Sequence, residues 1–289
     1  MESKMQKALS SLGRWQEALA CPVCGGGIEV EAHRIRCVHG HSWDVNRKGY
    51  VNLLSRPHAT YYDQALFAAR GRLLGAGVYE PVIQALAAYL RPGDRVLDAG
   101  CGEGYYLDAL SRITPIEGAG IDISRDAIAQ AACHEAPQLW LVGDVARLPF
   151  KPGSLDVILD ILTPASYRAF WQALKPEGLL MKVYPGCDYL KELRMAMGLP
   201  AYAAGDVETY ARQNARVEAI EEIHKTLTIT PQMYRDFVFM PPLTQRLTLS
   251  EKEALAGRPQ ERMTLHLTLA VLKGKEADFS PFPTGSGVV

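Results

Sequence analysis

Three cysteines and one histidine near the start of the chain have the spacing of a zinc site. Cys21 and Cys24 enclose two residues, Cys37 follows after twelve more, and another three separate Cys37 from His41. Two thiolates of a C-x-x-C turn and a second Cys/His pair can supply the four corners of a tetrahedron around zinc. This set leaves no open coordination position, so we expect a structural zinc ion. His39 is the alternative fourth ligand, although its shorter separation from Cys37 would close poorly around one ion.

A glycine-rich turn further along the chain has the features of a ligand-binding loop. An apolar segment runs into the pattern D-x-G-x-G-x-G, formed by Asp98, Gly100, Gly102 and Gly104, at the expected start of a helix. Glycines allow a tight turn and a ligand close to the backbone, because a Cβ atom would block the approach. The spacing differs from the G-x-G-x-x-G of dinucleotide folds, and a carboxylate here suits a cationic ligand and would repel a pyrophosphate. The pattern therefore favours S-adenosylmethionine over NAD.

Two further acidic residues follow the next expected strands. Asp122 ends a strand 24 residues after Asp98, where a carboxylate can accept both hydroxyls of a ribose. Asp144 comes directly after the third strand, where the amino group of an adenine would lie. A structural role as a helix cap stays open for Asp144, as it does for Asp126. We therefore expect one nucleoside-like cofactor to be bound by Asp98, Gly100, Gly102, Asp122 and Asp144.

These residues need strands and helices that alternate along the chain. Strands are expected near 95–98, 117–123, 138–142, 155–160 and 179–184, with helices near 104–112, 125–134 and 165–174. Such alternation indicates a parallel sheet covered on both faces. Apolar alternation in 217–230 and 263–273, on either side of a helix near 231–238, predicts an antiparallel pair at one edge of the sheet. The fold class is α/β, and the pattern over residues 80–273 resembles a class I (Rossmann-like) methyltransferase sheet.

The chain is expected to divide into five segments. Residues 1–20 form an N-terminal extension, whose apolar residues have helical spacing, and 21–58 form a zinc-binding module for RNA recognition. The module is too small to bury a core unaided. Residues 59–90 form a connecting helical segment, and 91–275 form an S-adenosylmethionine-dependent methyltransferase domain. The Ser-, Pro- and Gly-containing tail at 276–289 is expected to be disordered.

The overall charge of the chain is almost balanced. It has 31 Lys and Arg against 32 Asp and Glu, which argues against binding nucleic acid through the net field of the protein. There is no apolar run of about 18 residues and no secretory h-region, so we expect no membrane span and a cytoplasmic location. Thiols stay reduced in that compartment, which favours zinc over a disulfide for the clustered cysteines.

Basic residues are nevertheless concentrated around the cysteine module. Residues 31–60 contain five Lys or Arg against two acids, Glu31 and Asp44. Basic groups contact phosphates, and aromatic faces such as those of Trp43 and Tyr50 can stack on unpaired bases. For these two aromatic side chains, filling the small core of the module is the stronger interpretation. We expect the RNA contacts to come from Arg34, Arg36, Arg47, Lys48 and Arg56.

Taken in order, these motifs resemble those of the 23S rRNA (guanine-N1)-methyltransferases that modify a hairpin loop. The matching stretches are the cysteine module, 49–54, Ala-Arg-x-Arg-x-Leu at 69–74, Gly77-x-Tyr79 and 97–106. The resemblance implies S-adenosylmethionine-dependent methylation of a guanine in 23S rRNA. It also implies a homodimer that holds the RNA in a cleft between its subunits. Some members of this family confer resistance to macrolides.

The resemblance also assigns individual site residues. It places the zinc ligands at Cys21, Cys24, Cys37 and His41, and cofactor contacts at Tyr79, Gly102, Glu103 and Asp122. A further cofactor contact of the family is a histidine in a Pro-Gly-x-x-His-Leu run. In this chain Tyr189 stands in its place.

Methylation at N1 requires that guanine loses a proton, because N1 is protonated at neutral pH. Asp160 ends the fourth strand and is the candidate base by position, with capping of the following segment as the alternative. The catalytic residue is therefore unassigned.

Two other functions stay open. A small-molecule methyltransferase would share the glycine loop but has no need of a basic zinc module. A non-catalytic rRNA-binding or assembly protein is disfavoured by the intact set Asp98, Gly100, Gly102 and Asp122.

Overall fold

The computed structural model describes residues 3–56, 64–202 and 205–275. Its helices are α1 (Lys4–Trp15), α2 (Gln64–Gly75), α3 (Glu80–Ala87), α4 (Tyr105–Ile113), α5 (Arg125–Ala131), α6 (Tyr167–Ala173), α7 (Lys191–Ala196), α8 (Gly205–Asn214), α9 (Pro231–Phe239) and α10 (Leu249–Ala256), with a 3-10 helix at Pro242–Thr244. Its strands are β1 (Ile28–Val30), β2 (Arg34–Cys37), β3 (Ser42–Asp44), β4 (Val51–Asn52), β5 (Arg95–Ala99), β6 (Glu117–Asp122), β7 (Leu139–Val142), β8 (Leu155–Ile161), β9 (Leu174–Pro185), β10 (Arg216–Thr228) and β11 (Arg262–Lys273). The expected tail at 276–289 lies outside the described residues. Within the described residues, no helix is long and apolar enough to cross a membrane.

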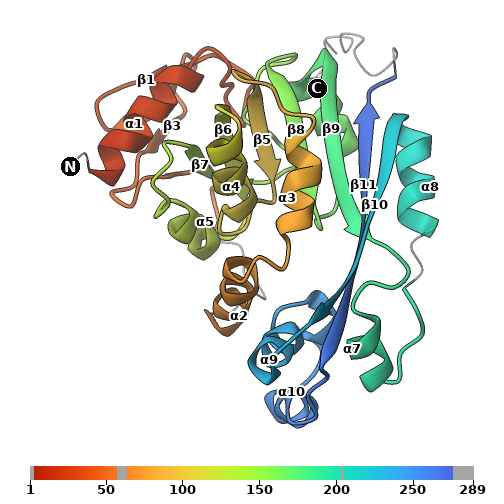
Figure 1. Ribbon diagram of the computed structural model, residues 1–289. Coiled ribbons are helices and arrows are strands. Elements are labelled where there is room, and N and C mark those ends of the chain that lie inside the picture. Colours follow the sequence, from red (N-terminus) through yellow and green to blue (C-terminus); the bar gives the residue numbers. More distant parts are fainter. Residues whose placement is uncertain (1–2, 57–63, 203–204, 276–289) are drawn as a thin grey trace, which may run out of the picture.

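An eight-stranded sheet runs through the molecule in the order β10-β11-β9-β8-β5-β6-β7-β4 (Figure 1). The strands from β9 to β4 are parallel to one another, whereas β11 pairs antiparallel with both β9 and β10. The predicted antiparallel pair at the sheet edge is thus confirmed. Because the parallel strands end at one edge, the segments that follow β5, β6, β8 and β9 meet there.

The parallel strands are buried on both faces, as their continuous apolar runs require. Consecutive residues of a strand point to opposite sides, so Val96 belongs to one hydrophobic core and Leu97 to another. The first core contains residues of α3 and α4, and the second contains residues of α1 and α6. Helices therefore cover both faces of the sheet, which fixes the strand ends rigidly.

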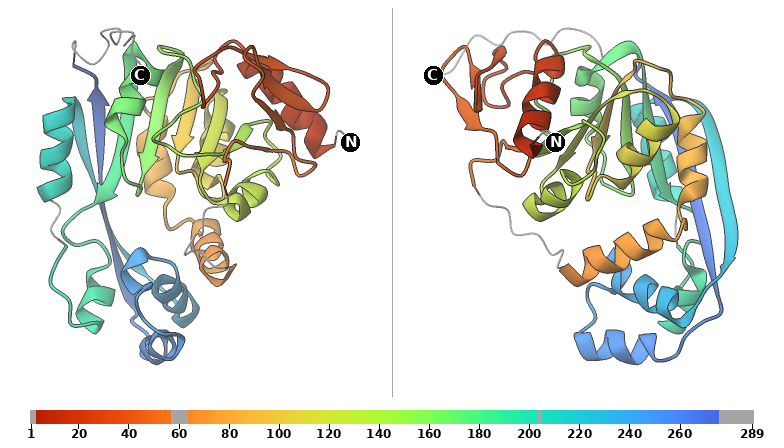
Figure 2. Two further views of the ribbon diagram at one scale, coloured as in Figure 1. Left: turned by 180° about the vertical axis from the view of Figure 1, so that it is seen from behind. Right: turned by 60° about the vertical axis from the view of Figure 1, so that its left-hand side comes forward.

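The N-terminal region is built into the main body of the protein. Trp15 of α1 is 1% exposed and packs edge-on against Phe150 with ring centroids 5.5 Å apart. The strands β1 to β3 form a small antiparallel sheet, and the chain then adds β4 to the main sheet beside β7 (Figure 2). The sequence predicted the helix but not this pairing, since the two residues of β4 are too few to show a strand pattern.

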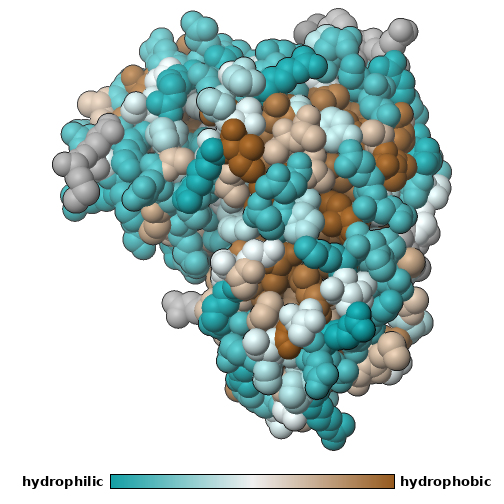
Figure 3. Space-filling model, in the orientation of Figure 1, coloured by the Kyte–Doolittle hydropathy of each residue, from teal (hydrophilic) through white to brown (hydrophobic). Residues whose placement is uncertain are grey.

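Helices α2 and α9 pack against each other beyond the carboxyl ends of the strands. Arg72 on α2 holds the buried carboxylate of Asp236 on α9 with a bidentate contact, Nη2 to Oδ1 at 2.6 Å and Nε to Oδ2 at 3.0 Å. On the face drawn in Figure 3, apolar residues gather where these helices meet the sheet, within a largely hydrophilic surface. This arrangement brings α2 over the strand ends.

Candidate functional site

A cavity of about 580 Å³ lies at the carboxyl ends of β5, β6, β8 and β9, beside α2. Its walls include Arg70, Thr163 and Lys182, which the sequence analysis did not assign to the site. The predicted site residues that line it are Tyr79, Gly100, Gly102, Asp122 and Tyr189. The fold thus brings together five of the eight predicted cofactor residues on one cavity wall.

The glycine loop is held in a conformation that requires glycine. Gly100 and Gly102 have φ angles of 80° and 55°, in the left-handed region that side chains with a Cβ rarely adopt. A Cβ on Gly100 would lie 2.5 Å from Cγ2 of Thr163. The backbone N–H of Gly102 donates to Oδ2 of Asp122 at 2.9 Å, and the other oxygen of Asp122 accepts the N–H of Ser124 at 2.7 Å. Asp122 therefore ties the loop to the end of β6.

Asp98 lies at the end of β5 but is not among the residues that line the cavity. Its side chain is 1% exposed, and its Oδ2 has no hydrogen-bond partner among the described residues. Burial raises the pKa of this carboxyl to about 7, with Arg70 opposing the rise and the nearby Asp122 and Asp160 adding to it. A buried carboxyl oxygen without a donor is a place where a cationic ligand group can bind.

Two tyrosines and an arginine complete the polar wall. The hydroxyl groups of Tyr79 and Tyr189 lie 3.0 Å apart, and burial raises the pKa of both, so both stay protonated near neutral pH. Nε of Arg70 lies 3.7 Å from Oε1 of Glu103. An added Cβ at Gly102 would lie 2.8 Å from Nη1 of Arg70, so the guanidinium covers the glycine loop. Arg70 lies in the Ala-Arg-x-Arg run that carries the family resemblance, and that run could have identified Arg70 from the sequence.

Glu103 and Asp144 are the remaining predicted residues, and neither lines the cavity. Glu103 is 9% exposed and contacts the cavity only through Arg70. Oδ1 of Asp144 accepts the backbone N–H of Ala146 at 2.9 Å. This contact closes a turn between β7 and β8, so Asp144 does not cap a helix. Its contact with the adenine amino group stays a prediction.

Asp160, the candidate base, is engaged by its neighbours. It is fully buried, and its Oδ2 accepts Nζ of Lys182 at 2.8 Å while its Oδ1 accepts the Thr163 hydroxyl at 2.5 Å. The Lys182 ammonium also donates to the Thr163 carbonyl at 3.0 Å. Only Lys182 and Thr163 of this group line the cavity. In the sequence, Lys182 could have been recognised as a charged residue within the otherwise apolar run of β9.

The zinc-type residues of the N-terminal module converge as a cluster. One ligand atom each of Cys21, Cys24, Cys37 and His41 lies within 4.8 Å of the others. Sγ of Cys24 and Sγ of Cys37 are 3.4 Å apart, and Sγ of Cys21 lies 3.6 Å from Nδ1 of His41. These separations fit ligands at the corners of a tetrahedron around zinc. His39 lies 3.3 Å from Sγ of Cys24 but is not part of the four-residue group.

A Rossmann-like sheet with this glycine loop, preceded by a zinc ribbon, defines a class I S-adenosylmethionine-dependent methyltransferase. Residues 96–178 match a methyltransferase domain family, and residues 19–58 match the N-terminal zinc ribbon domain of RlmA. The zinc ribbon is the element that separates this chain from methyltransferases with the sheet alone.

Three relatives share a more specific name. The chain is 32% identical to the 23S rRNA (guanine(748)-N1)-methyltransferase of Streptomyces fradiae over 88% of its own length and 94% of the relative. It is 40% identical to YxjB of Bacillus subtilis (strain 168), over 60% of this chain and 66% of that one, and 34% identical to a Micromonospora griseorubida protein over 63% and 70%. Both carry 23S rRNA (guanine-N1)-methyltransferase names. The chain belongs to the 23S rRNA (guanine-N1)-methyltransferase family.

Proposed function

We propose that this protein transfers a methyl group from S-adenosylmethionine to N1 of one guanine in a hairpin loop of 23S rRNA. The observation that carries the proposal is the union in one chain of the RlmA-type zinc ribbon with the cavity at the glycine loop. A small-molecule methyltransferase would need the cavity but not the ribbon. The name of the Streptomyces fradiae relative supports the same substrate.

The cofactor would bind along the wall formed by the glycine loop and the ends of β5 and β6. Asp122 is placed to accept the ribose hydroxyls, and Gly100 and Gly102 let the ligand approach the backbone. We assign the buried carboxyl of Asp98 to the ammonium group of the cofactor and the guanidinium of Arg70 to its carboxylate. Tyr79 and Tyr189 would donate hydroxyl hydrogen bonds. When bound, the cofactor supplies an electrophilic methyl group on its sulfonium.

Glu103 and Asp144 receive supporting roles in this proposal. Glu103 holds Arg70 over the glycine loop through its ion pair. Asp144 shapes the turn after β7 through Ala146, and its contact with the adenine amino group stays a prediction.

Lys182 is the residue that we assign to the target guanine. Loss of the N1 proton leaves guanine with a negative charge that is shared with O6, and an ammonium group beside O6 stabilises that anion. Lys182 has three donors and uses two of them on Asp160 and Thr163, which leaves one for a group in the cavity. Asp160 then positions Lys182, and water accepts the proton. The cofactor held by Asp98, Arg70 and Asp122 would supply the methyl group that the N1 lone pair accepts, and its sulfur would leave with the bonding electron pair.

The zinc ribbon would bind the RNA through its basic side chains. Arg47 and Lys48 are exposed beside β4, while Tyr50 is 4% exposed and lies in the core. Burial of Tyr50 favours its structural role over base stacking. Trp43 is partly buried against the second core, in agreement with the same interpretation.

Family membership supports three further proposals. We propose that the protein is a homodimer with the RNA between its subunits, that it acts in the cytoplasm, and that methylation lowers macrolide sensitivity. Sedimentation of the purified protein tests the first proposal, since a monomer at micromolar concentration would contradict it. Growth inhibition by macrolides, compared between a deletion strain and the same strain complemented with the gene, tests the last proposal.

The activity is tested with labelled S-adenosylmethionine and 23S rRNA from a strain that lacks the enzyme. We expect label in the rRNA and a stop to primer extension at one guanine, because an N1 methyl group blocks base pairing. Asp122→Ala serves as the control that should lose cofactor binding and label together. Label that enters only a small-molecule fraction of a cell extract would support the small-molecule alternative instead.

A further inference from the structure

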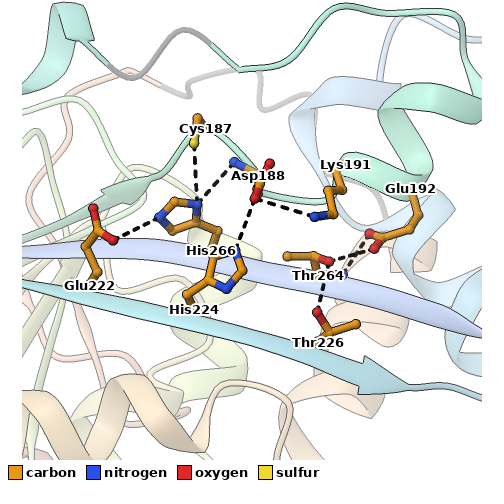
Figure 4. Close-up of polar contacts among 9 residues, drawn as sticks. All are labelled: Cys187, Asp188, Lys191, Glu192, Glu222, His224, Thr226, Thr264 and His266. Atoms are coloured by element: carbon orange, nitrogen blue, oxygen red, sulfur yellow. Dashed lines mark hydrogen bonds and ion pairs between the residues drawn. The ribbon is translucent and has the colours of Figure 1, made fainter.

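A second cluster of metal-binding side chains lies apart from the zinc ribbon, where the loop after β9 meets β10 and β11 (Figure 4). One ligand atom each of Cys187, Asp188 and His266 lies within 4.8 Å of the others. His224 on β10 is the register partner of His266 on β11, and their rings are 4.5 Å apart. Nε2 of His224 lies 3.2 Å from Oδ2 of Asp188. Sulfur, imidazole and carboxylate groups thus converge from three segments of the chain.

The surroundings of His266 determine which ring nitrogen can bind a ligand. Its side chain is 7% exposed, and Nδ1 accepts the backbone N–H of Asp188 at 3.2 Å, so the ring proton belongs on Nε2. Nε2 has no hydrogen-bond partner among the described residues and lies 3.8 Å from Oε2 of Glu222. A carboxylate beside one nitrogen of a histidine is typical of metal sites, where it orients the ring and raises the basicity of the other nitrogen.

The backbone also makes room for this ring. A Cβ at position 186 would lie 2.4 Å from Cδ2 of His266, so only glycine leaves space for the imidazole beside the loop. Sγ of Cys187 lies 3.7 Å from Nδ1 of His266, close to the 3.6 Å between Cys21 and His41 in the zinc ribbon. The same pair of donor atoms is therefore held at the same spacing in both clusters.

We propose that Cys187, Asp188 and His266 form a second metal site, for Zn²⁺ or a similar divalent transition metal, with His224 as the fourth ligand. A thiolate with imidazole and one carboxylate suits such metals and does not suit Mg²⁺ or Ca²⁺. On binding, the Cys187 thiol loses its proton to water, and the metal replaces the backbone N–H as the partner of Nδ1. It also displaces the Lys191 ammonium, which lies 3.4 Å from Oδ2 of Asp188, so this site binds more weakly than the ribbon.

The site has a consequence for the cavity, which rests on the proposed function. Residues Tyr189 and Leu190, which line the cavity, follow directly after the two ligands of the loop. Leu190 has a φ angle of 52°, in the left-handed region that is strained for a residue with a Cβ. A metal on Cys187 and Asp188 fixes this strained segment, so its occupancy is expected to strengthen cofactor binding.

Metal content of the full-length protein tests the site without reference to activity. The protein is equilibrated with micromolar Zn²⁺, passed through a desalting column, and analysed by elemental mass spectrometry. We expect two zinc equivalents for the wild type and for Cys133→Ser, which removes another exposed cysteine, and one equivalent for Cys187→Ser. Co²⁺ titration gives a second readout, because thiolate coordination produces a charge-transfer absorption band. Cys187→Ser should remove the contribution of the single thiolate at the second site, and Cys24→Ser should leave that contribution in place.

The outcome that overturns the proposal is a single zinc equivalent in the wild type, or a second equivalent that Cys187→Ser does not remove. His266 is buried and its replacement could unfold the strand, so His224→Asn, at a half-exposed side chain, is the second variant. It should weaken the second equivalent at least tenfold in the Co²⁺ titration. If the wild-type protein binds two zinc equivalents but does not methylate rRNA, the proposed function is refuted and the metal site stands.

Discussion

Lys182 and Asp160 are register partners on adjacent strands, with Nζ of the lysine 2.8 Å from Oδ2 of the aspartate. Their side chains are 7% and 0% exposed, so the ion pair lies between β9 and β8 almost without water. The Thr163 hydroxyl donates to the other oxygen of Asp160, and the Thr163 carbonyl accepts a second N–H of Lys182, which leaves one N–H of the ammonium group for the cavity. The pair presents one positive charge to the cavity while its negative charge is buried behind it.

Removal of one partner of this pair is expected to destabilise the protein strongly. Asp160→Ala leaves the Lys182 ammonium buried without its counter-charge, at a cost of about 3–5 kcal/mol in the free energy of unfolding. The double variant Asp160→Ala, Lys182→Met removes both charges and should recover part of that loss. Urea denaturation of the wild type, both single variants and the double variant measures the coupling. Additive effects of the two substitutions would contradict a functional ion pair.

Lys182 is expected to affect the rate more than the affinity for cofactor. Lys182→Met removes the charge that stabilises the guanine anion, and kcat should fall roughly 100-fold near neutral pH. Without that charge N1 loses its proton only at higher pH, so the rate of the variant should continue to rise with pH where the wild-type rate has levelled. Rates measured between pH 6 and 9, with Lys182→Arg as the variant that keeps the charge, test the assignment. Equal reduction at every pH would indicate a merely structural role.

The buried carboxyl of Asp98 predicts a stability that depends on pH. Its pKa of about 7 in the folded protein lies above the ordinary value of 3.8. Between these values the unfolded chain ionises and the folded protein does not, so the ligand-free protein loses stability as pH rises toward 7. Each unit of difference in pKa corresponds to about 1.4 kcal/mol. Asp98→Asn should make this slope shallower in urea denaturation between pH 4.5 and 8, and the part that stays belongs to Glu103, Asp122 and Asp160, whose pKa values burial also raises.

Cofactor affinity should show the opposite trend. A cationic group of the cofactor favours the ionised Asp98, so affinity should increase as pH rises through 7 and then level off. Asp98→Asn should bind the cofactor more weakly and with no such rise. Calorimetric titration with S-adenosylhomocysteine, which keeps the ammonium group, makes the measurement. An unchanged pH profile in Asp98→Asn would show that Asp98 does not face that group.

The sequence was sufficient for those parts of the fold that local patterns specify. The glycine loop, the acid at the end of β6 and the Cys/His cluster were predicted because each has a distinctive pattern within a short stretch of the sequence. Arg70 and Lys182 were missed because their places depend on long-range packing, α2 over the strand ends and β9 beside β8. The helix α10 was also missed, although Thr248 and Glu251 form a capping box that marks its start. Asp144 has a local pattern, but its contact with Ala146 could be known only from the backbone of the turn.

Four of the five basic residues of the ribbon form two pairs that should contribute unequally to RNA binding. Arg34 lies within 4.0 Å of Glu31 and 3.8 Å of Asp44, and Arg36 lies 3.8 Å from Glu31. Arg47 and Lys48 are exposed and have no ion pair within the described part of the chain. Their charges are thus available to phosphates, whereas those of the first pair are partly compensated on the protein.

Two double variants that remove the same number of charges test this division. Arg47→Ala, Lys48→Ala should weaken RNA binding and make the negative slope of log affinity against log salt shallower by about 1.4, since each single-stranded contact contributes about 0.7. The matched control Arg34→Ala, Arg36→Ala should change the slope by less, because the two charges that it removes are already partly compensated by Glu31 and Asp44. Filter binding of the hairpin loop at several salt concentrations gives both slopes. Cofactor affinity should stay unchanged in both variants, because the ribbon surface and the cavity are separate. Equal slopes for the two variants would show that the ion pairs open on binding.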